Sequence, residues 1–375
     1  MSSTRVEGDI LTPSGLIRGH LDIEHGRVAH IEGAPLAPDN SRAAGRALIV
    51  PGFIDTHVHG GGGSDIMEAG EASAQVARIH ARHGTTSLLA TTMTAPMTEI
   101  SGALQALAPA VQTRAPGAAR ILGVHLEGPY INPGKLGAQP NFARAASFSE
   151  IETLCRLVPI RVVTIAPELA DALEVIEQLR ATGVRVQIGH TLGEYEKGVE
   201  ALNCGACGFT HLFNAMTGIH HREPGMVGAA LAHAQYSEII PDLLHVHPGA
   251  IHVALRAIPF LFCVTDSTAA AGMPDGEYRL GRHRVTKCLG GVRLADGTLA
   301  GSTLTMDQAL RNLVNIGVGL ADASRRVSTY AADYLQLPDR GRIAQDAWAD
   351  LCVLDRELQL QRVIVEGEEI DLAHA

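Results

Sequence analysis

The sequence lacks several features that would point to particular classes of protein. No apolar run reaches the ~18 residues of a membrane-spanning helix, and the N-terminus has no apolar segment typical of a signal peptide. Lys and Arg total 30 against 40 Asp and Glu, giving a formal net charge of −10. Because the positive charges are also scattered singly, neither nucleic acid nor an anionic membrane is an expected partner. We expect a soluble cytoplasmic protein.

Cysteine is also scarce. Six cysteines at irregular spacing in 375 residues do not suggest a disulfide framework. Cys204 and Cys207 have the spacing of a redox motif, but they lie among small residues before an apolar strand, which favours a structural interpretation. The sequence has no Gly-x-Ser-x-Gly motif for a nucleophilic serine and no Gly-x-x-x-x-Gly-Lys motif for phosphate. Hydrolysis without a serine nucleophile is therefore favoured over group transfer.

What the chain does have is a regular alternation of apolar strands and helical patterns. Its length suffices for a barrel of roughly 250 residues with a smaller domain beside it. The pattern predicts a (β/α)8 TIM-like barrel of residues 50–340, flanked by a small β-sandwich domain of residues 1–49 and 341–375. The eight strand candidates are 50–59, 85–91, 120–127, 161–166, 184–190, 208–213, 236–246 and 261–266. Helices are expected at 71–83, 99–111, 149–157, 170–181, 194–203, 305–316 and 322–335.

The first barrel strand ends in an unusual way. Its apolar run leads to His57-Val58-His59 and then opens into four glycines at 60–63. Because side chains alternate along a strand, both imidazoles face the same side and form half of a possible metal site. Read alone, the pair could equally be two surface histidines at a strand end. The glycine run is a weak nucleotide loop, since no helical pattern begins until about residue 71.

Other predicted strands also end in polar residues. The set comprises His57 and His59 after the first strand, then Glu127, His190, His211 and Asp266 after the third, fifth, sixth and eighth. Active sites of such barrels form where the strands end, so these residues are expected to converge. A single strand-end histidine is more often structural, but six polar residues in register are difficult to explain in that way. Four imidazoles and two carboxylates suit one or two divalent metals of the zinc or iron type.

A metal in such a site predicts hydrolytic chemistry. It lowers the pKa of bound water toward ~7, which supplies a nucleophile at neutral pH. A carboxylate beside that water can take its proton and later pass it to a leaving group. Asp266 is the candidate for this role, because it ends the last strand and faces His57 and His59 across the mouth of the barrel.

At this point the residues resemble a known family. The segment Pro51-Gly-Phe-Ile-Asp-Thr-His57-Val-His59-Gly is similar to the first-strand signature of the amidohydrolase superfamily. More narrowly, further segments resemble the N-acetylglucosamine-6-phosphate deacetylase family, and the similarity spans roughly residues 48 to 355. They are His125-Leu-Glu127-Gly-Pro, Gly189-His190-Thr, Thr210-His211-Leu-Phe-Asn214-Ala-Met216, Arg222-Glu-Pro-Gly and Val264-Thr-Asp266, together with Ala300-Gly301-Ser302.

The resemblance implies specific roles. Glu127, His190 and His211 would bind one metal, and the retained His57 and His59 make a second metal plausible. Zinc is the expected ion, with iron, cobalt or manganese as alternatives. Asp266 would be the general base and then the acid, and would also be a metal ligand. The substrate, a phosphorylated amino sugar, would be held by a set of nine residues: Ala138, Gln139, Asn214, Ala215, Arg222, His245, Leu299, Ala300 and Gly301.

The resemblance also implies an oligomeric assembly. The match to the family is, however, incomplete. A contact supplied by a neighbouring subunit in the family maps to His245, which implies a homodimer. Family members usually have a histidine where this chain has Gln139, in a loop that is one residue shorter. Two alternatives therefore stay open: a sister enzyme acting on another N-acyl amino sugar, such as N-acetylgalactosamine-6-phosphate, or on another amide; and a catalytically silent binding scaffold. The scaffold is disfavoured by the intact set of candidate ligands.

Overall fold

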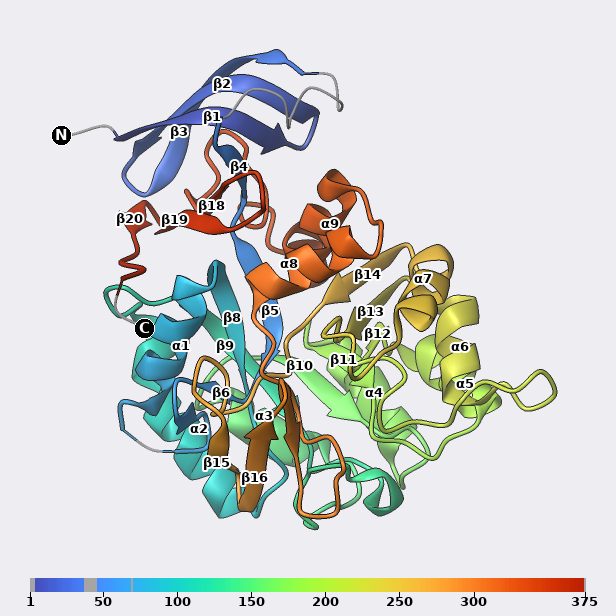
Figure 1. Ribbon diagram of the computed structural model, residues 1–375. Coiled ribbons are helices and arrows are strands. Elements are labelled where there is room, and N and C mark those ends of the chain that lie inside the picture. The colour runs from blue at the N-terminus through green and yellow to red at the C-terminus, as the bar shows by residue number, and fades with distance from the viewer. Residues whose placement is uncertain (1–3, 37–45, 69, 374–375) are drawn as a thin grey trace.

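A barrel and a smaller sheet make up the protein. The computed structural model describes residues 4–36, 46–68 and 70–373. Figure 1 shows the smaller sheet at one end of the molecule, beyond the barrel. The longest helix in the described ranges has 16 residues, and no helix there could cross a lipid bilayer.

The smaller sheet joins the two ends of the chain. Its seven strands lie in the order β20-β19-β18-β4-β1-β2-β3. Apolar residues from strands near both ends of this order, among them Val28 and Ile364, pack in one cluster, so the sheet folds over its own face. The strands are β1 (Thr4–Thr12), β2 (Gly15–Glu24), β3 (Arg27–Pro35), β4 (Leu48–Pro51), β18 (Leu351–Leu354), β19 (Leu360–Val365) and β20 (Glu368–Glu369). Of residues 1–49 and 341–375, the structure leaves 1–3, 37–45 and 374–375 undescribed.

The barrel has the eight strands that the sequence predicts. Six of them form one parallel sheet in the order β12-β11-β10-β9-β8-β5, and β13 and β14 form a parallel pair beside it. Backbone hydrogen bonds close the ring, from Leu212 N to Glu238 O and from Asp266 N to His57 O. The strands are β5 (Phe53–Val58), β8 (Thr85–Thr91), β9 (Arg120–Glu127), β10 (Ile160–Ile165), β11 (Arg185–Ile188), β12 (Gly208–Phe209), β13 (Tyr236–Ile239) and β14 (Phe260–Cys263).

Helices surround the barrel (Figure 1). Most match the predicted positions: α1 (Ala72–Arg82), α2 (Met97–Gln112), α3 (Phe148–Cys155), α4 (Ala172–Arg180), α5 (Tyr195–Cys204) and α8 (Met306–Asn315). The predicted helix 322–335 is instead two helices, α9 (Leu320–Val327) and α10 (Thr329–Tyr334). They separate at Ser328, whose hydroxyl donates to Ser324 O at 2.6 Å, a backbone contact that disturbs helices.

Two helices lie outside the predicted set. They are α6 (Gly225–His233) and α7 (Pro248–Ala257). The first has no alternation between an apolar and a polar face that a sequence pattern could detect, because its residues 225–230 are all buried and mostly small. The second begins at a proline, the residue that favours the first helical position, with the His247 side chain accepting from Gly249 N.

The opening strand of the barrel is interrupted. The sequence predicts one strand over 50–59, but β4 belongs to the smaller sheet and β5 to the barrel, with Gly52 between them. A Cβ at Gly52 would lie 2.3 Å from Thr86 Cγ2, so only glycine fits this crossing. The glycine run that follows forms a tight hairpin of β6 (Gly60–Gly61) and β7 (Ser64–Asp65), turning through Gly62 and Gly63 at positive φ. This hairpin has no helix following directly, unlike a nucleotide loop.

A small three-stranded sheet lies beside the open end of the barrel, where Leu280 lines the cavity. Its strands are β15 (Gly276–Leu280), β16 (His283–Cys288) and β17 (Gly291–Arg293), and an apolar cluster that includes Met93 and Leu280 packs beneath it.

The six cysteines, all within the described ranges, are unpaired. Cys207 Sγ lies 3.5 Å from the Tyr334 hydroxyl and forms no disulfide with Cys204.

Candidate metal centre and active site

The polar residues that end the barrel strands meet at one place. His57 and His59 leave β5 on the same side, and their Nε2 atoms lie 3.2 Å apart. Glu127, at the end of β9, lies between these two rings and the rings of His190 and His211. The alternation of side chains along β5 is thus sufficient to pair the two imidazoles, as the sequence predicts.

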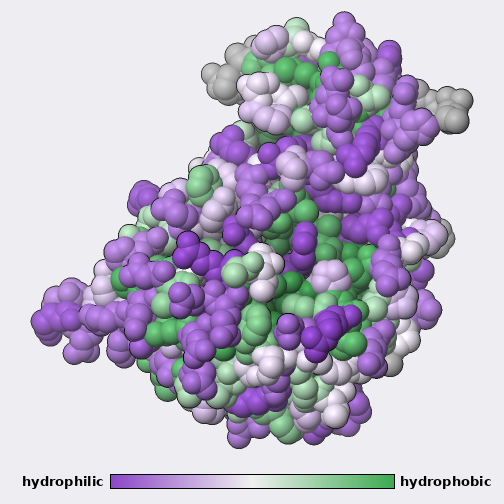
Figure 2. All heavy atoms as spheres, turned by 180° about the vertical axis from the view of Figure 1, so that it is seen from behind, coloured by the Kyte–Doolittle hydropathy of each residue, from purple (hydrophilic) through white to green (hydrophobic). Residues whose placement is uncertain are grey.

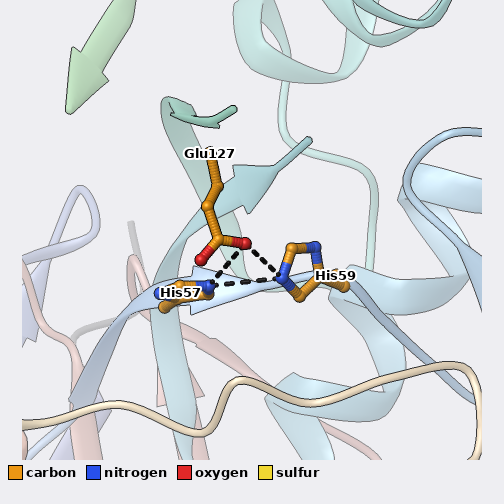
Figure 3. Close-up of side chains that lie close together, drawn as sticks. All are labelled: His57, His59 and Glu127. Atoms are coloured by element: carbon orange, nitrogen blue, oxygen red, sulfur yellow. Dashed lines mark hydrogen bonds and ion pairs between the residues drawn. The ribbon is translucent and has the colours of Figure 1, made fainter. Parts of the chain in front are cut away.

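Glu127 divides the cluster into two groups. Its Oε2 lies 3.4 Å from His57 Nε2 and 3.1 Å from His59 Nε2, as Figure 3 shows. Its Oε1 lies 3.1 Å from the Nε2 atoms of both His190 and His211, which are themselves 3.1 Å apart. One carboxylate therefore serves two neighbouring sets of ligand atoms, one with each oxygen.

Asp266 completes the first group. Its Oδ1 lies 3.4 Å from His57 Nε2 and 3.3 Å from His59 Nε2. Asp266, His190 and His211 share an uncommon feature, because each has a left-handed backbone, with φ of 51°, 48° and 29°. Such conformations are costly for residues other than glycine and are concentrated at functional sites.

The cluster is buried and rich in negative charge. Glu127, Asp266 and a third carboxylate, Glu238, are each less than a tenth exposed. No Lys or Arg of the described chain forms an ion pair with any of them, and the partners are imidazoles instead. A buried carboxylate is stable only with a compensating charge.

The imidazoles respond to this charge. Burial alone would lower the pKa of His59, but hydrogen bonds to Asp266 and Glu127 outweigh it and raise the pKa to about 9. The pKa of His57 is raised in the same way, with burial opposed by the charges of Glu127 and Asp266. Burial would raise the pKa of Glu127, yet the charge of His57 and hydrogen bonds from His190 and His211 hold it well below its usual range. The raised pKa values of His57 and His59 thus reflect the negative charge of the carboxylates beside them.

The arrangement fits a divalent metal. Three sets of ligand atoms each converge within 4.8 Å: His57 with His59 and Glu127, Glu127 with His190 and His211, and His57 with His125 and Glu238. The first two share Glu127 and meet at the strand ends. Imidazole nitrogen and carboxylate oxygen are the donors that zinc and similar ions prefer. The outer nitrogens of two rings are already fixed, since His57 Nδ1 lies 3.1 Å from Glu238 Oε2 and His190 Nδ1 lies 2.8 Å from Lys135 O. Their Nε2 atoms lie on the side of Glu127, at 3.4 and 3.1 Å from its carboxylate oxygens.

A cavity of about 370 Å3 opens above the cluster. His59, Glu127, His190, His211 and Asp266 lie at its base, while His57 is fully buried behind them. Seven of the predicted substrate contacts line it: Ala138, Gln139, Asn214, Ala215, His245, Leu299 and Gly301. The structure adds Met93, Lys135, Leu280 and Thr298, which come from loops and the three-stranded sheet and which no motif in the sequence singles out.

Two predicted contacts do not line this cavity. Ala300 is fully buried, with its backbone N–H bonded to Val292 O, and so it supports the cavity wall instead. Arg222 is exposed, and its Nη1 lies 2.7 Å from His221 Nε2. It belongs to the loop between β12 and α6, which projects from the barrel in both Figure 1 and Figure 2, where its tip is hydrophilic. Within one chain, therefore, Arg222 is not part of the cavity wall.

His245 also differs from the expectation. The resemblance predicts that it reaches the active site of a neighbouring subunit, but it lines the cavity of its own chain. Its Nδ1 lies 2.6 Å from Asp242 Oδ2. Burial acts to lower the pKa of His245, and the hydrogen bond to Asp242 outweighs it and raises the pKa. His245 is thus a site for positive charge at the cavity wall.

Gln139 holds a position between the cavity and the cluster. Its Nε2 donates to Glu127 Oε2 at 2.6 Å, and its Oε1 accepts from Thr94 N at 2.7 Å. The amide therefore has one fixed orientation, and it contacts the same carboxylate oxygen as His57 and His59. A substitution here affects the ligand group and the cavity wall together.

Glu238 is the residue that sequence reasoning missed. It lies in the middle of β13, is fully buried, and contacts His57 from inside the barrel. A signal was available, because a carboxylate in the interior of a predicted barrel strand has no solvent to face. Attention to strand ends, where barrel active sites form, passes over such a residue.

Comparisons with known proteins agree with this geometry. The sequence profile of the amidohydrolase family matches residues 48–370. N-acetylgalactosamine-6-phosphate deacetylase of Escherichia coli O157:H7 is 39% identical, with 96% of this chain and 97% of the relative covered. N-acetylglucosamine-6-phosphate deacetylase of Bacillus subtilis is 34% identical, with 96% and 94% covered.

Solved structures agree as well. A mutant of N-acetyl-D-glucosamine-6-phosphate deacetylase from Mycobacterium smegmatis, in complex with N-acetyl-D-glucosamine-6-phosphate, superposes with a TM-score of 0.90 at 35% identity, covering 99% of this chain and 100% of that one. The N-acetylglucosamine-6-phosphate deacetylase of Thermotoga maritima gives a TM-score of 0.89 at 32% identity, covering 98% and 99%.

Proposed function

The chain belongs to the amidohydrolase family and, within it, to the N-acetylglucosamine-6-phosphate deacetylases, and on that premise we propose that it hydrolyses the acetamide of N-acetylglucosamine-6-phosphate to glucosamine-6-phosphate and acetate. The observation that carries the proposal is the double ligand group around Glu127 at the base of a cavity. A cluster of this kind suits hydrolysis of an unactivated amide, which needs both a strong nucleophile and a polarised carbonyl.

The metal would be held mainly by three residues. Glu127, His190 and His211 would bind the indispensable ion, and His57, His59 and Asp266 would hold a second one that shares Glu127. When bound, a divalent ion, for which zinc is the first candidate, lowers the pKa of a water ligand and polarises a carbonyl oxygen. Both positions would lie at the floor of the cavity, where the acetamide must lie to react.

Asp266 would move the proton. Burial acts to raise its pKa, but the charges of protonated His57 and His59 outweigh burial and lower it. A bound divalent ion would supply positive charge at the same place and would keep the carboxylate ionised and able to accept a proton. Asp266 lines the cavity, where it would be within reach of an attacking water and of the amide nitrogen. The same carboxyl group would then donate that proton to the departing amine, so that acetate and the free amino sugar leave.

The cavity wall would bind the sugar phosphate. Lys135 and His245 line it and would supply positive charge, with Asn214 available for hydrogen bonds to hydroxyl groups. Leu299 and Gly301 line it together with Thr298. A phosphate dianion needs several such donors. We assign Lys135 and His245 as donors to the phosphate within this chain.

The homodimer stays part of the proposal, but with a different contact. His245 serves its own cavity, whereas Arg222 is on a projecting loop with no ion-pair partner among the described residues. A forked guanidinium at the tip of such a loop is suited to a phosphate that lies outside its own chain. Replacing Arg222 by Met should raise KM sharply for the phosphorylated sugar only, and an equal effect on the unphosphorylated sugar would contradict phosphate recognition.

Acetate release tests the function. The purified protein, loaded with zinc, should release acetate from N-acetylglucosamine-6-phosphate, and an Asp266→Asn variant should lose roughly 100- to 10,000-fold in kcat, because an amide cannot accept the proton. Metal content of the variant is the control, since this substitution leaves the three residues of the main site intact. Turnover near that of the wild type would overturn the assignment of Asp266, and absence of metal in the wild type would revive the scaffold alternative.

One observation favours a second candidate substrate, N-acetylgalactosamine-6-phosphate. The relative from Escherichia coli O157:H7 that matches 96% of this chain at 39% identity carries that activity in its name, and Gln139 stands where the expected family has histidine. A comparison of kcat/KM for the two epimeric sugar phosphates decides between them. N-acyl amino acids in the same assay extend the test to other amides, and a higher kcat/KM for any of these would replace the proposed substrate.

A further inference from the structure

The interior of the barrel contains a carboxylate that the reaction scheme does not use. Glu238 is fully buried below the metal cluster, on β13, and accepts from three side chains. Thr56 Oγ1 donates to its Oε1 at 2.8 Å, and Gln187 Nε2 donates to the same oxygen at 3.1 Å. His57 Nδ1 lies 3.1 Å from its Oε2. No Lys or Arg in the described chain pairs with it.

We propose that Glu238 is a positioning residue that fixes the proton of His57 on Nδ1 and so directs a bare Nε2 at the His57–His59 metal position. This deepens the proposed function and rests on its metal centre. A neutral imidazole carries one proton, and whichever nitrogen holds it cannot bind a metal. Because a carboxylate can only accept, its contact with Nδ1 selects the tautomer that leaves Nε2 as a ligand.

The surroundings require a carboxylate rather than an amide at this position. All three side-chain partners of Glu238 donate, and His211 N donates to Oε2 as well, at 3.4 Å. An amide at 238 would turn its NH2 group toward either the Thr56–Gln187 side or the His57 side. Gln187 cannot adapt, because its own oxygen already accepts from Thr210 at 2.9 Å. An NH2 facing His57 would move the proton to Nε2 and block metal binding there.

The other metal position does not depend on this carboxylate. The outer nitrogen of His190 lies 2.8 Å from a backbone carbonyl, Lys135 O, on a different loop. The contact between Glu238 and His211 involves only the backbone N–H, so the ring of His211 is not oriented by it. Glu238 should therefore act on one metal position of the two, and this selectivity is what the test must detect.

Metal stoichiometry is the direct test. Metal-free wild-type protein, titrated with zinc, should bind two ions per chain, and Glu238→Gln should keep the first while its affinity for the second falls roughly 10- to 100-fold. The double variant with His57→Ala should bind no less than His57→Ala alone, because Glu238 acts through His57. Asp55→Asn is the matched control, since Asp55 is also a fully buried carboxylate near His57, but it accepts from Thr265 and from backbone N–H groups, and its replacement should leave two ions bound.

Several outcomes would overturn the proposal: a wild type that binds one ion, a Glu238→Gln variant with two ions of unchanged affinity, equal weakening of both ions, or the same loss in Asp55→Asn.

If Glu238→Gln does not fold, nitrogen-15 NMR of zinc-loaded wild-type protein replaces the zinc titration of that variant. A slowly exchanging, far-downfield Nδ1 proton should be present and should be missing in His57→Gln, and its absence from the wild type would be the contrary result. Failure of acetate release with these results intact would count against the proposed substrate instead, so the two proposals can fail separately.

Discussion

Two clusters of charge in this protein are built on opposite principles. The metal centre has three carboxylates, Glu127, Glu238 and Asp266, and no Lys or Arg paired with them in the described chain. The second cluster, at the junction of barrel and smaller sheet, has three carboxylates and three guanidinium groups. Its members are Asp350, Glu366 and Glu368 with Arg114, Arg120 and Arg340.

The junction neutralises itself. Arg340 Nη1 lies 2.6 Å from Asp350 Oδ2, and its other terminal nitrogen pairs with Glu366. Glu366 also receives Arg120 at 2.7 Å, from the start of a barrel strand. Because every charge has a partner within the chain, this cluster needs no ion and serves to join the sheet to the barrel. The metal centre is left negative by comparison, which is the condition for binding a cation.

The largest effect should follow from removing a ligand of the main metal position. His190→Ala removes one of the three donors of the main position, the others being Glu127 and His211. The value of kcat should fall by roughly three orders of magnitude, about 4 kcal/mol in the barrier. The control is His57→Ala, which removes a donor from the second position and should lower bound metal from two ions to one with much of the activity retained. Equal losses in both variants would show that the two positions are not ranked as proposed.

At the junction, the same kind of substitution should affect stability instead. Arg340→Met leaves Asp350 without its paired guanidinium, and breaking a buried pair costs about 3–5 kcal/mol of unfolding free energy. Denaturant unfolding of the metal-free protein measures this loss. The folded variant should bind metal and process substrate with unchanged KM. A loss of bound metal would mean that the two clusters are coupled rather than independent.

Lowering the pH should weaken the junction by a smaller amount of unfolding free energy. Burial would raise the pKa of Glu366, but hydrogen bonds and charges from Arg120 and Arg340 outweigh it and lower the pKa to about 2. Because this value lies below the usual 4.5, the ionised form stabilises the fold above that pH, and the contribution is lost as the pH falls toward 2. After allowance for solvent screening, the loss should be roughly 1–2 kcal/mol.

Metal-free wild type and Glu366→Gln provide the comparison. At pH 7 the wild type should unfold at a higher temperature than the variant, and near pH 2.5 the difference should shrink. Other carboxylates titrate in both proteins alike, so their effects cancel in the difference. A gap that stays constant with pH would mean that Glu366 does not hold the depressed pKa.

The same contrast explains what the sequence could predict. The strand ends at His57, His190 and Asp266 are visible because apolar runs point to them, and strand periodicity alone places them at one end of a barrel. The eight strands follow from the same pattern. Neither Glu238 nor Arg340 could be found in this way. The contacts of Glu238 depend on barrel closure, and those of Arg340 depend on how the smaller sheet packs against the barrel. The Thr56 partner of Glu238, for example, lies 182 residues away in the chain.

The substrate side was predicted less completely for a related reason. Gln139 lines the cavity as expected, but whether a loop residue faces its own cavity or projects outward depends on loop conformation. Arg222 and His245 show both outcomes, opposite to the assignment made from sequence. Lys135 and Met93 gave no signal at all, because single residues in loops carry no periodicity.

The smallest effect should come from an ion pair that belongs to neither cluster. Arg362 and Glu369 pair at 2.8 Å on neighbouring strands of the smaller sheet, with side chains 36% and 54% exposed. Water already compensates both charges, so Arg362→Met should cost no more than about 0.5 kcal/mol of unfolding free energy. Both variants replace an arginine by methionine, and they differ in how deeply the ion pair is buried. A loss approaching that of Arg340→Met would show that pairing itself, rather than desolvation of the partner left behind, determines stability at the junction.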